Sequence, residues 1–304
     1  MSVSIIIPAH NEAHFITFTV NRLHEVLKGH VPYEVIIVEN ASTDGTRDAL
    51  RSLDDVTVIH VDQKVTVSMA RNIGIAAAQL PIIALVDADV LLTAQWAAEL
   101  VRQIDQLRQD PLQITGCRYA LSESPSWIEK SWFAHMRASG TPYINSGNLI
   151  TTREVVDLVG GFDPGMITGE DVDFCLRAAR QGVRLVVNEQ FVAHHEGYPR
   201  SLLSFFSREL WHGTGDFRNA RTFFHSKVAI FSMATTIMVV VSAVCFLLGY
   251  STTSLALLAI AFLANASAVN SRFKYKFTQY LILIFLHMVY CAARSTAIFR
   301  RQQV

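Results

Sequence analysis

The sequence predicts an α/β fold with a mostly parallel sheet, followed by a membrane-embedded C-terminal region. Short apolar segments alternate with amphipathic segments along residues 1–216, and turn-forming residues separate them, which is typical of strand–helix repeats. Residues 228–271 contain no charged side chain, which predicts membrane helices. With 304 residues, the chain can hold one large domain and an appendage.

The apolar segments of residues 1–216 indicate buried strands because they are short and bounded by turn residues. The expected strands are Val3–Ile7, Tyr33–Glu39, Val56–Val61 and Ile82–Val86, and the expected helices cover about residues 12–28, 43–53, 67–79 and 93–107. Ligands of such sheets bind beyond the carboxyl ends of the strands. Polar residues that directly follow a strand are therefore the first candidates for a site.

The net charge of zero hides two regions of opposite charge. Residues 1–216 carry 17 basic and 26 acidic side chains, net −9, whereas residues 217–304 carry nine basic and no acidic ones, net +9. A hydrophobic share of 51% excludes a disordered chain. The four cysteines show no paired spacing, which argues against a zinc site or a disulfide scaffold. No nucleic-acid partner is expected.

The C-terminal region divides into three apolar stretches, with expected helices at about 228–249, 254–270 and 277–298. The first two predict a membrane hairpin, and the basic segment Arg272–Lys276 places its open end on the cytoplasmic side. The third stretch ends in Arg294, Arg300 and Arg301, so it either spans or lies in the interface. A buried soluble hairpin is the alternative.

The N-terminus does not predict a signal peptide, because Pro8 to Glu12 interrupt the first apolar run. The expected location is therefore the inner (cytoplasmic) membrane, as a multi-pass protein with the domain of residues 1–216 facing the cytoplasm.

Asp87 and Asp89 follow the apolar strand that ends at Val86. In an extended segment residues i and i+2 point the same way, so both carboxylates should face one ligand. Carboxylate oxygens suit Mg²⁺ or Mn²⁺ shared with phosphate oxygens. A solvated loop is the alternative for the pair taken alone.

Other polar residues stand at equivalent points. They are Pro8, Asn11 and Glu12 after the first strand, Glu39, Asn40 and Asp44 after the second, and Arg71 in the third helical segment. Asn and Asp at such places also cap helices or form turns. Asn40 can both donate to and accept from a base edge, and the guanidinium of Arg71 suits a diphosphate.

Two later segments complete the candidate set. Glu170 and Asp171 open an amphipathic helix, where the helix dipole favours acids, and a carboxylate there could also act as a general base. A neutral imidazole from His194 or His195 could join the metal.

The order of these motifs resembles the inverting glycosyltransferases of family 2, which have the GT-A nucleotide-sugar-binding fold. The resemblance, to a membrane-anchored bacterial-type member, covers about residues 1–216. It rests on the segments Pro8–Glu12, Glu39–Thr46, Ala70–Gly74, Asp87–Asp89, Gly160–Asp163, Gly169–Asp173 and a late histidine. The expected catalytic domain is residues 1–216, and the expected membrane region is 217–304.

The resemblance implies a role for each residue. Asp87 and Asp89 would hold Mn²⁺ or Mg²⁺ and the diphosphate, with Asp89 the more direct ligand and His194, or its rival His195, beside the metal. Asp171 would be the catalytic base, next to Glu170. The nucleotide would contact Pro8, Asn11, Glu12, Glu39, Asn40, Asp44 and Arg71. The implied reaction moves one sugar from a nucleotide-sugar to an acceptor hydroxyl, on a lipid-linked glycan or another cell-envelope polysaccharide precursor.

Two departures from the family pattern matter. Glu39-Asn40 replaces a pair of aspartates, which leaves the nucleotide base open. Ser207–Trp211 lacks the Gln-x-x-Arg-Trp motif of processive relatives, which predicts a single transfer, with Arg208 and Trp211 near the acceptor entrance.

Three other functions stand beside this prediction. A polyprenyl-phosphate sugar synthase would need no strong base, and a non-catalytic membrane protein could retain a degenerate nucleotide-sugar pocket. A sugar-phosphate nucleotidyltransferase is disfavoured, because residues 1–15 contain no glycine for a phosphate loop.

Overall fold

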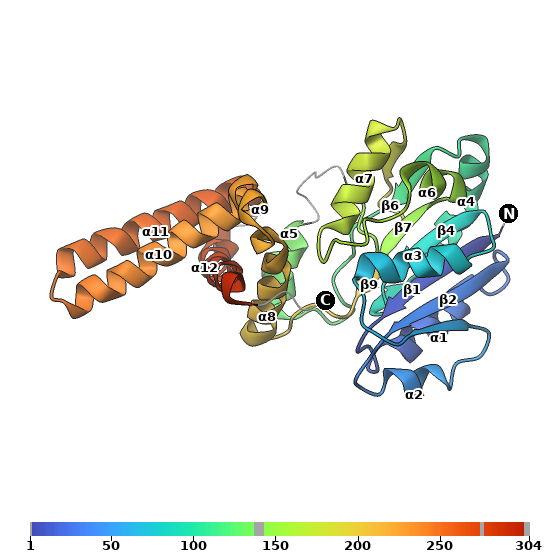
Figure 1. Ribbon diagram of the computed structural model, residues 1–304, viewed down its shortest axis with the longest axis horizontal. Coiled ribbons are helices and arrows are strands. Elements are labelled where there is room, and N and C mark those ends of the chain that lie inside the picture. Colours follow the sequence, from blue (N-terminus) through green and yellow to red (C-terminus); the bar gives the residue numbers. More distant parts are fainter. Residues whose placement is uncertain (1, 137–142, 274–276, 301–304) are drawn as a thin grey trace. The chain divides into compact units, whose positions relative to one another are not determined.

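A computed structural model describes residues 2–136, 143–273 and 277–300 of the chain. They form two compact units, drawn in Figure 1. The sheet unit comprises residues 2–123 and 143–198, and the membrane unit comprises residues 124–136, 199–273 and 277–300. This division differs from the predicted boundary at residue 216, because residues 124–136 and 199–216 pack with the C-terminal helices.

The sheet unit is built on seven strands in the order β3-β2-β1-β4-β7-β6-β8. Their bounds are β1 Val3–Ala9, β2 Tyr33–Asn40, β3 Thr57–Val61, β4 Ile82–Val86, β6 Gln113–Gly116, β7 Asn148–Thr152 and β8 Arg184–Val187. Strand β7 runs antiparallel to its neighbours and the other pairs are parallel. The four predicted strands are present, and the predicted mostly parallel α/β sheet is confirmed.

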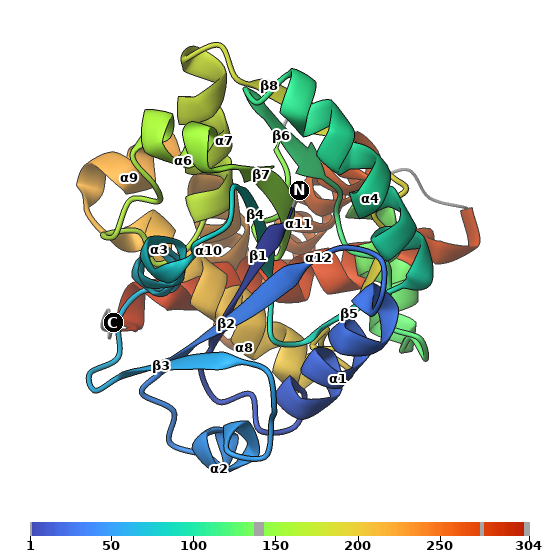
Figure 2. The ribbon, with the colours of Figure 1, turned by 90° about the vertical axis from the view of Figure 1, so that its right-hand side faces the viewer.

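Helices cover both faces of this sheet, as Figure 2 shows. Helices α1 (Ile16–Leu27) and α4 (Ala94–Gln109) cover one face, and α3 (Val67–Ala77), α6 (Arg153–Val159) and α7 (Glu170–Arg180) cover the other. Alternation along β1 explains the two cores, because Ile5 and Ile7 pack toward α1 while Ile6 packs toward α3. Both cores exclude water, so the strand ends are held firmly.

Shorter elements complete the edge of the sheet where the strands end. Helix α2 (Thr46–Leu50) follows β2, and β5 (Val90–Leu92) pairs with β9 (Ala193–His195) in a small antiparallel sheet. This small sheet brings residues 89 and 195–197 together, although a hundred positions separate them in the sequence.

The membrane unit is helical. Its elements are η1 (Glu129–Phe133), α5 (Ala134–Met136), α8 (Leu202–Gly213), η2 (Thr214–Phe217), α9 (Ala220–His225), α10 (Lys227–Leu247), α11 (Ser251–Arg272), η3 (Phe277–Gln279), α12 (Tyr280–Thr296) and η4 (Ala297–Phe299). Three segments, Lys227–Leu247, Ser251–Arg272 and Tyr280–Phe299, are long and apolar enough to cross a membrane. They agree with the three predicted helices and support membrane association. Lys274 and Lys276 of the predicted basic segment, and Arg301, lie outside the described residues.

Candidate active site

The predicted acidic pair lies in a turn rather than in an extended segment. β4 ends at Val86, and the N–H of Val90 donates to the carbonyl of Asp87 at 3.2 Å, which closes a turn over Asp87–Val90. The expected alternation therefore does not apply. The two carboxylates have different partners: Asp87 contacts Arg71 and Tyr119, and Asp89 lies beside His195.

Asp87 is held by two side chains. Nη2 of Arg71 donates to Oδ1 of Asp87 at 2.7 Å, and the hydroxyl of Tyr119 donates to Oδ2 at 2.6 Å. Burial alone would raise the pKa of Asp87, but Arg71 and Tyr119 outweigh it, so this pKa is lowered. Burial and the charge of Asp87 raise the pKa of Tyr119, so its phenol stays a donor. Asp87 is thus a fixed anion, and Tyr119, which no sequence motif marked, orients it.

Arg71 joins Asp87 to the helix that carries the candidate base. Its Nη1 donates to Oε1 of Glu170 at 2.8 Å, and the hydroxyl of Ser146 donates to the same oxygen at 3.2 Å. The Arg71 side chain is only 3% exposed. Both terminal nitrogens are engaged by carboxylates, and contact of Arg71 with a diphosphate stays a prediction. Arg71 is placed as a bridge between two acidic motifs.

Asp171 stands in the first turn of α7, one residue after Glu170. Gly169 directly precedes the helix, and its φ of +78°, which favours glycine, turns the chain into α7. The N–H of Val172 donates to Oδ1 of Asp171 at 2.8 Å. Burial, and then the negative charge of Glu170, raise the pKa of Asp171 to about 7. A carboxylate with this pKa is basic enough to accept a proton near neutral pH.

Asp89 faces His195, not His194. Oδ2 of Asp89 lies 3.6 Å from Nε2 of His195, whereas Nδ1 of His194 bonds to the carbonyl oxygen of Leu121 at 2.7 Å. Neighbouring residues of β9 point to opposite sides, so only one histidine can face the aspartate. Of the two candidates, His195 is therefore the one that faces Asp89, and the role of either histidine beside a metal stays a prediction.

The His195 ring is fixed by packing on two tyrosine rings. It stacks on Tyr198 with ring centroids 4.3 Å apart and lies 4.8 Å from the ring of Tyr119. Its Nδ1 is buried without a partner among the described residues, and 3.6 Å from Nε2 to Asp89 is too long for a hydrogen bond. A buried imidazole in this state is suited to a ligand.

A divalent metal fits this pair in part. Within the described ranges, no three His, Cys, Asp or Glu side chains converge as a complete metal site. Mg²⁺ and Mn²⁺ commonly bind through one or two protein ligands and complete their shell with substrate phosphates and water. The Asp89 carboxylate and the buried His195 imidazole supply such a partial donor set.

Two glycines let the carboxylates take these positions. A Cβ atom at Gly147 would fall on the carboxylate of Asp87 and the hydroxyl of Tyr119, and one at Gly197 would fall on the carboxylate of Asp89. Neither aspartate could keep its place beside a larger residue. No sequence motif singled out Gly197, because its neighbour Asp89 lies far away in the chain.

Glu12 adds a further acid to this edge of the sheet. Burial, followed by the charges of Asp89, Asp87 and Asp44, raises the pKa of Glu12 to about 8. The N–H of Glu12 donates to Oγ1 of Thr46 at 2.8 Å, which ties the loop after β1 to the start of α2. The predicted residues of both loops are therefore brought together.

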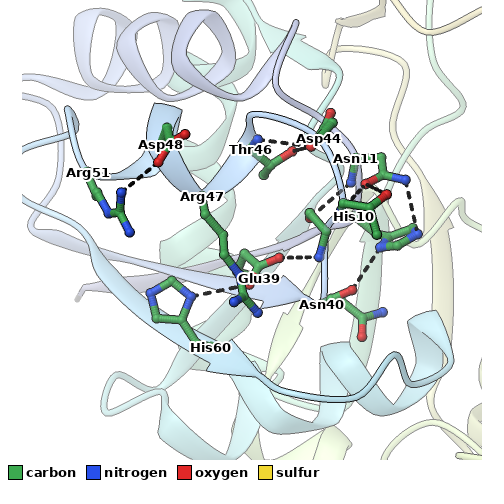
Figure 3. A network of polar contacts seen from close by, with 12 residues as sticks. His10, Asn11, Glu39, Asn40, Asp44, Thr46, Arg47, Asp48, Arg51 and His60 are labelled. Carbon is green, nitrogen blue, oxygen red and sulfur yellow. Dashed lines mark hydrogen bonds and ion pairs between the residues drawn. The ribbon is translucent and has the colours of Figure 1, made fainter.

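Figure 3 shows the polar network that joins these loops. Glu39 is fully buried, and its carboxylate accepts from Arg47 Nε at 2.6 Å and from the N–H of Ser42 at 2.5 Å, with His60 Nδ1 at 3.3 Å. Burial would raise the pKa of Glu39, but these hydrogen bonds together lower it. Glu39 therefore holds the loop from within.

Asn40 is also used by the protein itself. Its amide donates to the carbonyl of Val65 at 2.9 Å and accepts from the N–H of Val65 at 2.9 Å. The expected pairing with a base edge would have to share these same groups. The carbonyl of Asn40 bonds to His10 Nδ1 at 2.8 Å, which positions the loop after β1 (Figure 3).

Asn11 and Asp44 connect the two loops directly. The N–H of Thr43 donates to Oδ1 of Asn11 at 2.8 Å, and the N–H of Ala13 donates to Oδ2 of Asp44 at 3.2 Å. Asn11 has a φ of 60°, a conformation that asparagine tolerates. Pro8 lies within β1, half-buried at the same edge.

The two predicted acceptor residues belong to the membrane unit. Arg208 donates to Oε1 of Glu209 at 2.9 Å and lies over the ring of Phe133 at 4.8 Å, while Trp211 is 40% exposed. Both stand on α8. Their role toward an acceptor stays a prediction.

Comparison with known proteins places this fold and site in a family. Residues 4–155 match the profile of Glycosyl transferase family 2, and residues 82–292 match that of Glycosyl transferase family group 2. Glycosyltransferase AglE of Haloferax volcanii is 27% identical over 208 residues, which are 65% of this chain and 67% of AglE. The pre-mycofactocin glycosyltransferase of Mycobacterium tuberculosis is 25% identical over 225 residues, which are 69% of this chain and 46% of that protein. Apart from AglE, the curated relatives are longer in proportion, and this chain spans about half of their length or less.

Solved structures show the same fold. The mannosyltransferase PcManGT from Pyrobaculum calidifontis, in complex with GDP-Man and Mn²⁺, superposes with a TM-score of 0.60 at 19% identity over 98% of this chain and 86% of PcManGT. S. aureus TarS 1-349 in complex with UDP-GlcNAc gives a TM-score of 0.52 at 15% identity over 98% and 91% of the two chains. These likenesses confirm the predicted GT-A fold. Because the family profile matches half of the chain and covers the turn between β4 and β5 that carries Asp87 and Asp89, the chain belongs to glycosyl transferase family 2.

Proposed function

We propose that this chain transfers one sugar from a nucleotide-sugar donor to an acceptor hydroxyl, with inversion at the anomeric carbon. The observation that carries the proposal is the Arg71 bridge, which fixes the acidic motif after β4 against the start of α7. The donor-side carboxylates and the candidate base Asp171 thereby belong to one rigid site. The names of the relatives support a glycosyltransferase, and they include mannosyl and cell-envelope enzymes.

Asp171 would accept the proton of the acceptor hydroxyl as that oxygen attacks the anomeric carbon. Removal of the proton makes the oxygen a stronger nucleophile, and a single displacement inverts the carbon. Burial among acids, Glu170 first, keeps Asp171 more basic than an ordinary aspartate. Glu170 itself is a positioning residue, because Arg71 and Ser146 hold it.

The donor would bind with its diphosphate toward Asp89 and His195. A bound Mn²⁺ or Mg²⁺ would neutralise the charge that develops on the leaving diphosphate. Asp89 and His195 are the chain's own ligands for that ion in this proposal, and Asp87 keeps the turn in place through Arg71 and Tyr119. The loops of Pro8–Glu12 and Glu39–Asp44 would line the nucleoside side.

The acceptor would be a lipid-linked glycan or another envelope precursor presented at the membrane, since the same chain carries apolar helices. Arg208 and Trp211 on α8 are proposed to meet it. Transfer to the phosphate of a polyprenyl lipid is the competing reaction, and it would need no strong base.

The test compares Asp171→Asn with Asp173→Asn in full-length enzyme, with labelled nucleotide-sugars and membrane lipid extracts. Asp173 is a matched control, because it lies two residues further along the same helix and its carboxylate pairs with Arg177 at 2.7 Å. We expect Asp171→Asn to lose about two to four orders of magnitude in rate with donor affinity retained, and Asp173→Asn to stay near wild type. Near-normal transfer by Asp171→Asn onto a lipid phosphate would support the competing reaction, and no transfer by the wild type to any acceptor would support a non-catalytic pocket.

A further inference from the structure

Helices α10 and α11 form a hairpin with a closed and an open end. Near the closed end, the hydroxyl of Ser242 donates to the carbonyl of Ser254 at 2.9 Å, and Gly249 turns the chain with a φ of +85°. The two cationic ends, Lys227 and Arg272, therefore stand together at the open end. Each helix has more than 20 residues, enough to cross the apolar core of a bilayer.

Helix α12 contacts this hairpin at nearly the same distance from its open end, measured along the axes of α10 and α11. The hydroxyl of Tyr280 donates to the carbonyl of Ala266 at 3.2 Å, and Nδ1 of His287 lies 2.7 Å from Oδ1 of Asn265. Ala266 and Asn265 come six and seven residues before Arg272. At 1.5 Å per residue, both contacts lie about 9–10 Å from the open end.

The C-terminal end of α12 lies only slightly farther from the open end of the hairpin. The hydroxyl of Ser295 donates to that of Thr236 at 3.0 Å, and Thr236 comes nine residues after Lys227, about 13 Å from the open end. From Tyr280 to Ser295 the axis of α12 covers about 22 Å, while its height on the hairpin changes by about 5 Å. α12 therefore crosses the hairpin. Figure 1 shows α12 end-on where α10 and α11 lie lengthwise, and Figure 2 shows the reverse.

The two faces of α12 differ in polarity. Toward the protein it presents a mixed face, in which His287, Tyr290 and Arg294 are buried or half-buried among apolar residues such as Leu283 and Leu286. Its outer side is an apolar stripe, with Leu281 71% and Phe285 48% exposed. Half of the most apolar 18-residue stretch of the α12 segment is buried in the unit, whereas the corresponding share is 17% for α10 and 28% for α11. A helix whose exposed side is a single apolar stripe, and whose other side is held by protein, can lie in a membrane interface with that stripe toward lipid.

Ion pairs fasten the C-terminal end of α12 to the segment that leads into the hairpin. Nη2 of Arg294 lies 3.1 Å from Oε2 of Glu209, and Nη1 lies 3.4 Å from Oδ2 of Asp216 and donates to the carbonyl of His212 at 3.0 Å. Glu209 is 3% exposed, so this pairing is shielded from water. These residues precede Lys227, which keeps the end of α12 on the open side of the hairpin.

We propose that α10 and α11 alone cross the membrane, while α12 lies along its interface with the stripe of Leu281, Ile282, Phe285 and Val289 against lipid. The occupant of this stripe is the bilayer at the boundary between head groups and acyl chains, at the level of the open end of the hairpin. The C-terminus then returns to the side of the N-terminal sheet unit. This arrangement also keeps Arg294 and Arg300 on the side where cationic residues of membrane proteins gather.

The first arm of the test locates three tags on the full-length chain in sealed membrane vesicles. Protease-cleavable epitopes are placed at the N-terminus, at the C-terminus and in the Gly249 turn. We expect the two terminal tags to be cleaved in the same vesicle preparation, and the turn tag only in vesicles of the opposite orientation. A C-terminal tag that behaves like the turn tag would mean three spans and would overturn the proposal.

The second arm measures depth. A spin label at Val289→Cys, the midpoint of α12, is compared with one at Ile260→Cys, near the midpoint of α11, through collision with oxygen and with a water-soluble nickel chelate in lipid vesicles. We expect Val289 to report a shallow position and Ile260 a deep one. Equal depth at the two positions would overturn the interfacial assignment. Neither readout depends on activity, so the result is independent of the proposed function.

Discussion

The guanidinium of Arg71 lies 2.7 Å from the carboxylate of Asp87 in the interior of the sheet unit. The same guanidinium binds Glu170, which is 99 residues away in the sequence. One buried cation thus fixes both the turn after β4 and the start of α7. The distance between the donor side and the candidate base is set by this pairing and not by either motif alone.

Replacement of Arg71 by alanine should therefore disturb folding as well as activity. Loss of one partner from a buried ion pair leaves a charge without compensation, which costs about 3–5 kcal/mol. We expect a clear fall in the thermal unfolding temperature of the purified enzyme. Arg51→Ala is the control, because the Arg51–Asp48 pair is 78% exposed on both sides and should change stability by about 1 kcal/mol or less. Equal effects of the two variants would contradict the bridging role.

The pKa of Asp171 predicts the pH dependence of the reaction. A general base works in its ionised form, so kcat/KM should fall tenfold per pH unit below about 7 and level off above it. The measurement is a pH–rate profile from pH 5 to 9. Glu12 has a pKa of about 8 and could produce a similar inflection. The profile of Glu12→Gln should keep the inflection near 7, and its loss there would assign the titration to Glu12 instead.

Gly197→Ala should weaken donor binding without unfolding the protein. The new Cβ would overlap the carboxylate of Asp89 and press on the ring of His195, so the metal pair could not keep its geometry. We expect metal-dependent nucleotide binding to weaken at least about tenfold, equal to about 1.4 kcal/mol. Gly45→Ala is the matched control, because its Cβ would meet only Ala13 at an ordinary 3.6 Å. Unchanged binding by Gly197→Ala would argue against Asp89 and His195 as the metal side.

Glu39→Gln should lower stability more at neutral pH than in acid. The buried carboxylate of Glu39 accepts hydrogen bonds from Ser42, Arg47 and His60. A buried group that loses its hydrogen-bond partner destabilises the fold by about 1–3 kcal/mol. Because the folded-state pKa of Glu39 is lowered, its contribution is full above the unfolded pKa of about 4.3 and is lost as the pH falls through the folded pKa. The measurement is the unfolding temperature of the wild type and of Glu39→Gln at pH 7 and below pH 4. The two temperatures should differ at pH 7 and converge in acid. Asp48→Asn, on the exposed side of the neighbouring helix α2, should show no such difference.

The parallel core of the fold could be predicted because it depends on local patterns. Strands such as β1 and β4 are continuous apolar runs, and the polar residues that follow them mark the edge where the site forms. The turn at Asp87–Val90 could not be predicted, because the acidic pair continues a strand-like pattern.

The partners of the site residues depend on contacts between distant parts of the chain. Tyr119 orients Asp87 from 32 residues away, and no motif surrounds it. The choice between His194 and His195 depends on how the three-residue strand β9 pairs with β5, and so short a strand shows no alternation in the sequence. Asn40 has the polarity of a ligand group, yet the backbone of Val65 occupies it.

The division between the two units was also hidden from the sequence. Residues 124–136 and 199–216 are not apolar throughout, so composition groups them with the catalytic region. Trp132 and Phe205 instead pack together in the membrane unit, with ring centroids 5.3 Å apart.

The most direct test of the proposed site is calorimetric titration of the purified full-length protein with GDP and UDP, with Mn²⁺ and with EDTA, for the wild type and for Asp89→Asn. We expect the wild type to bind one diphosphate in the presence of Mn²⁺, to lose that binding in EDTA, and to lose it equally through Asp89→Asn. Binding that survives both EDTA and the substitution would contradict a metal-assisted donor site at Asp89 and His195.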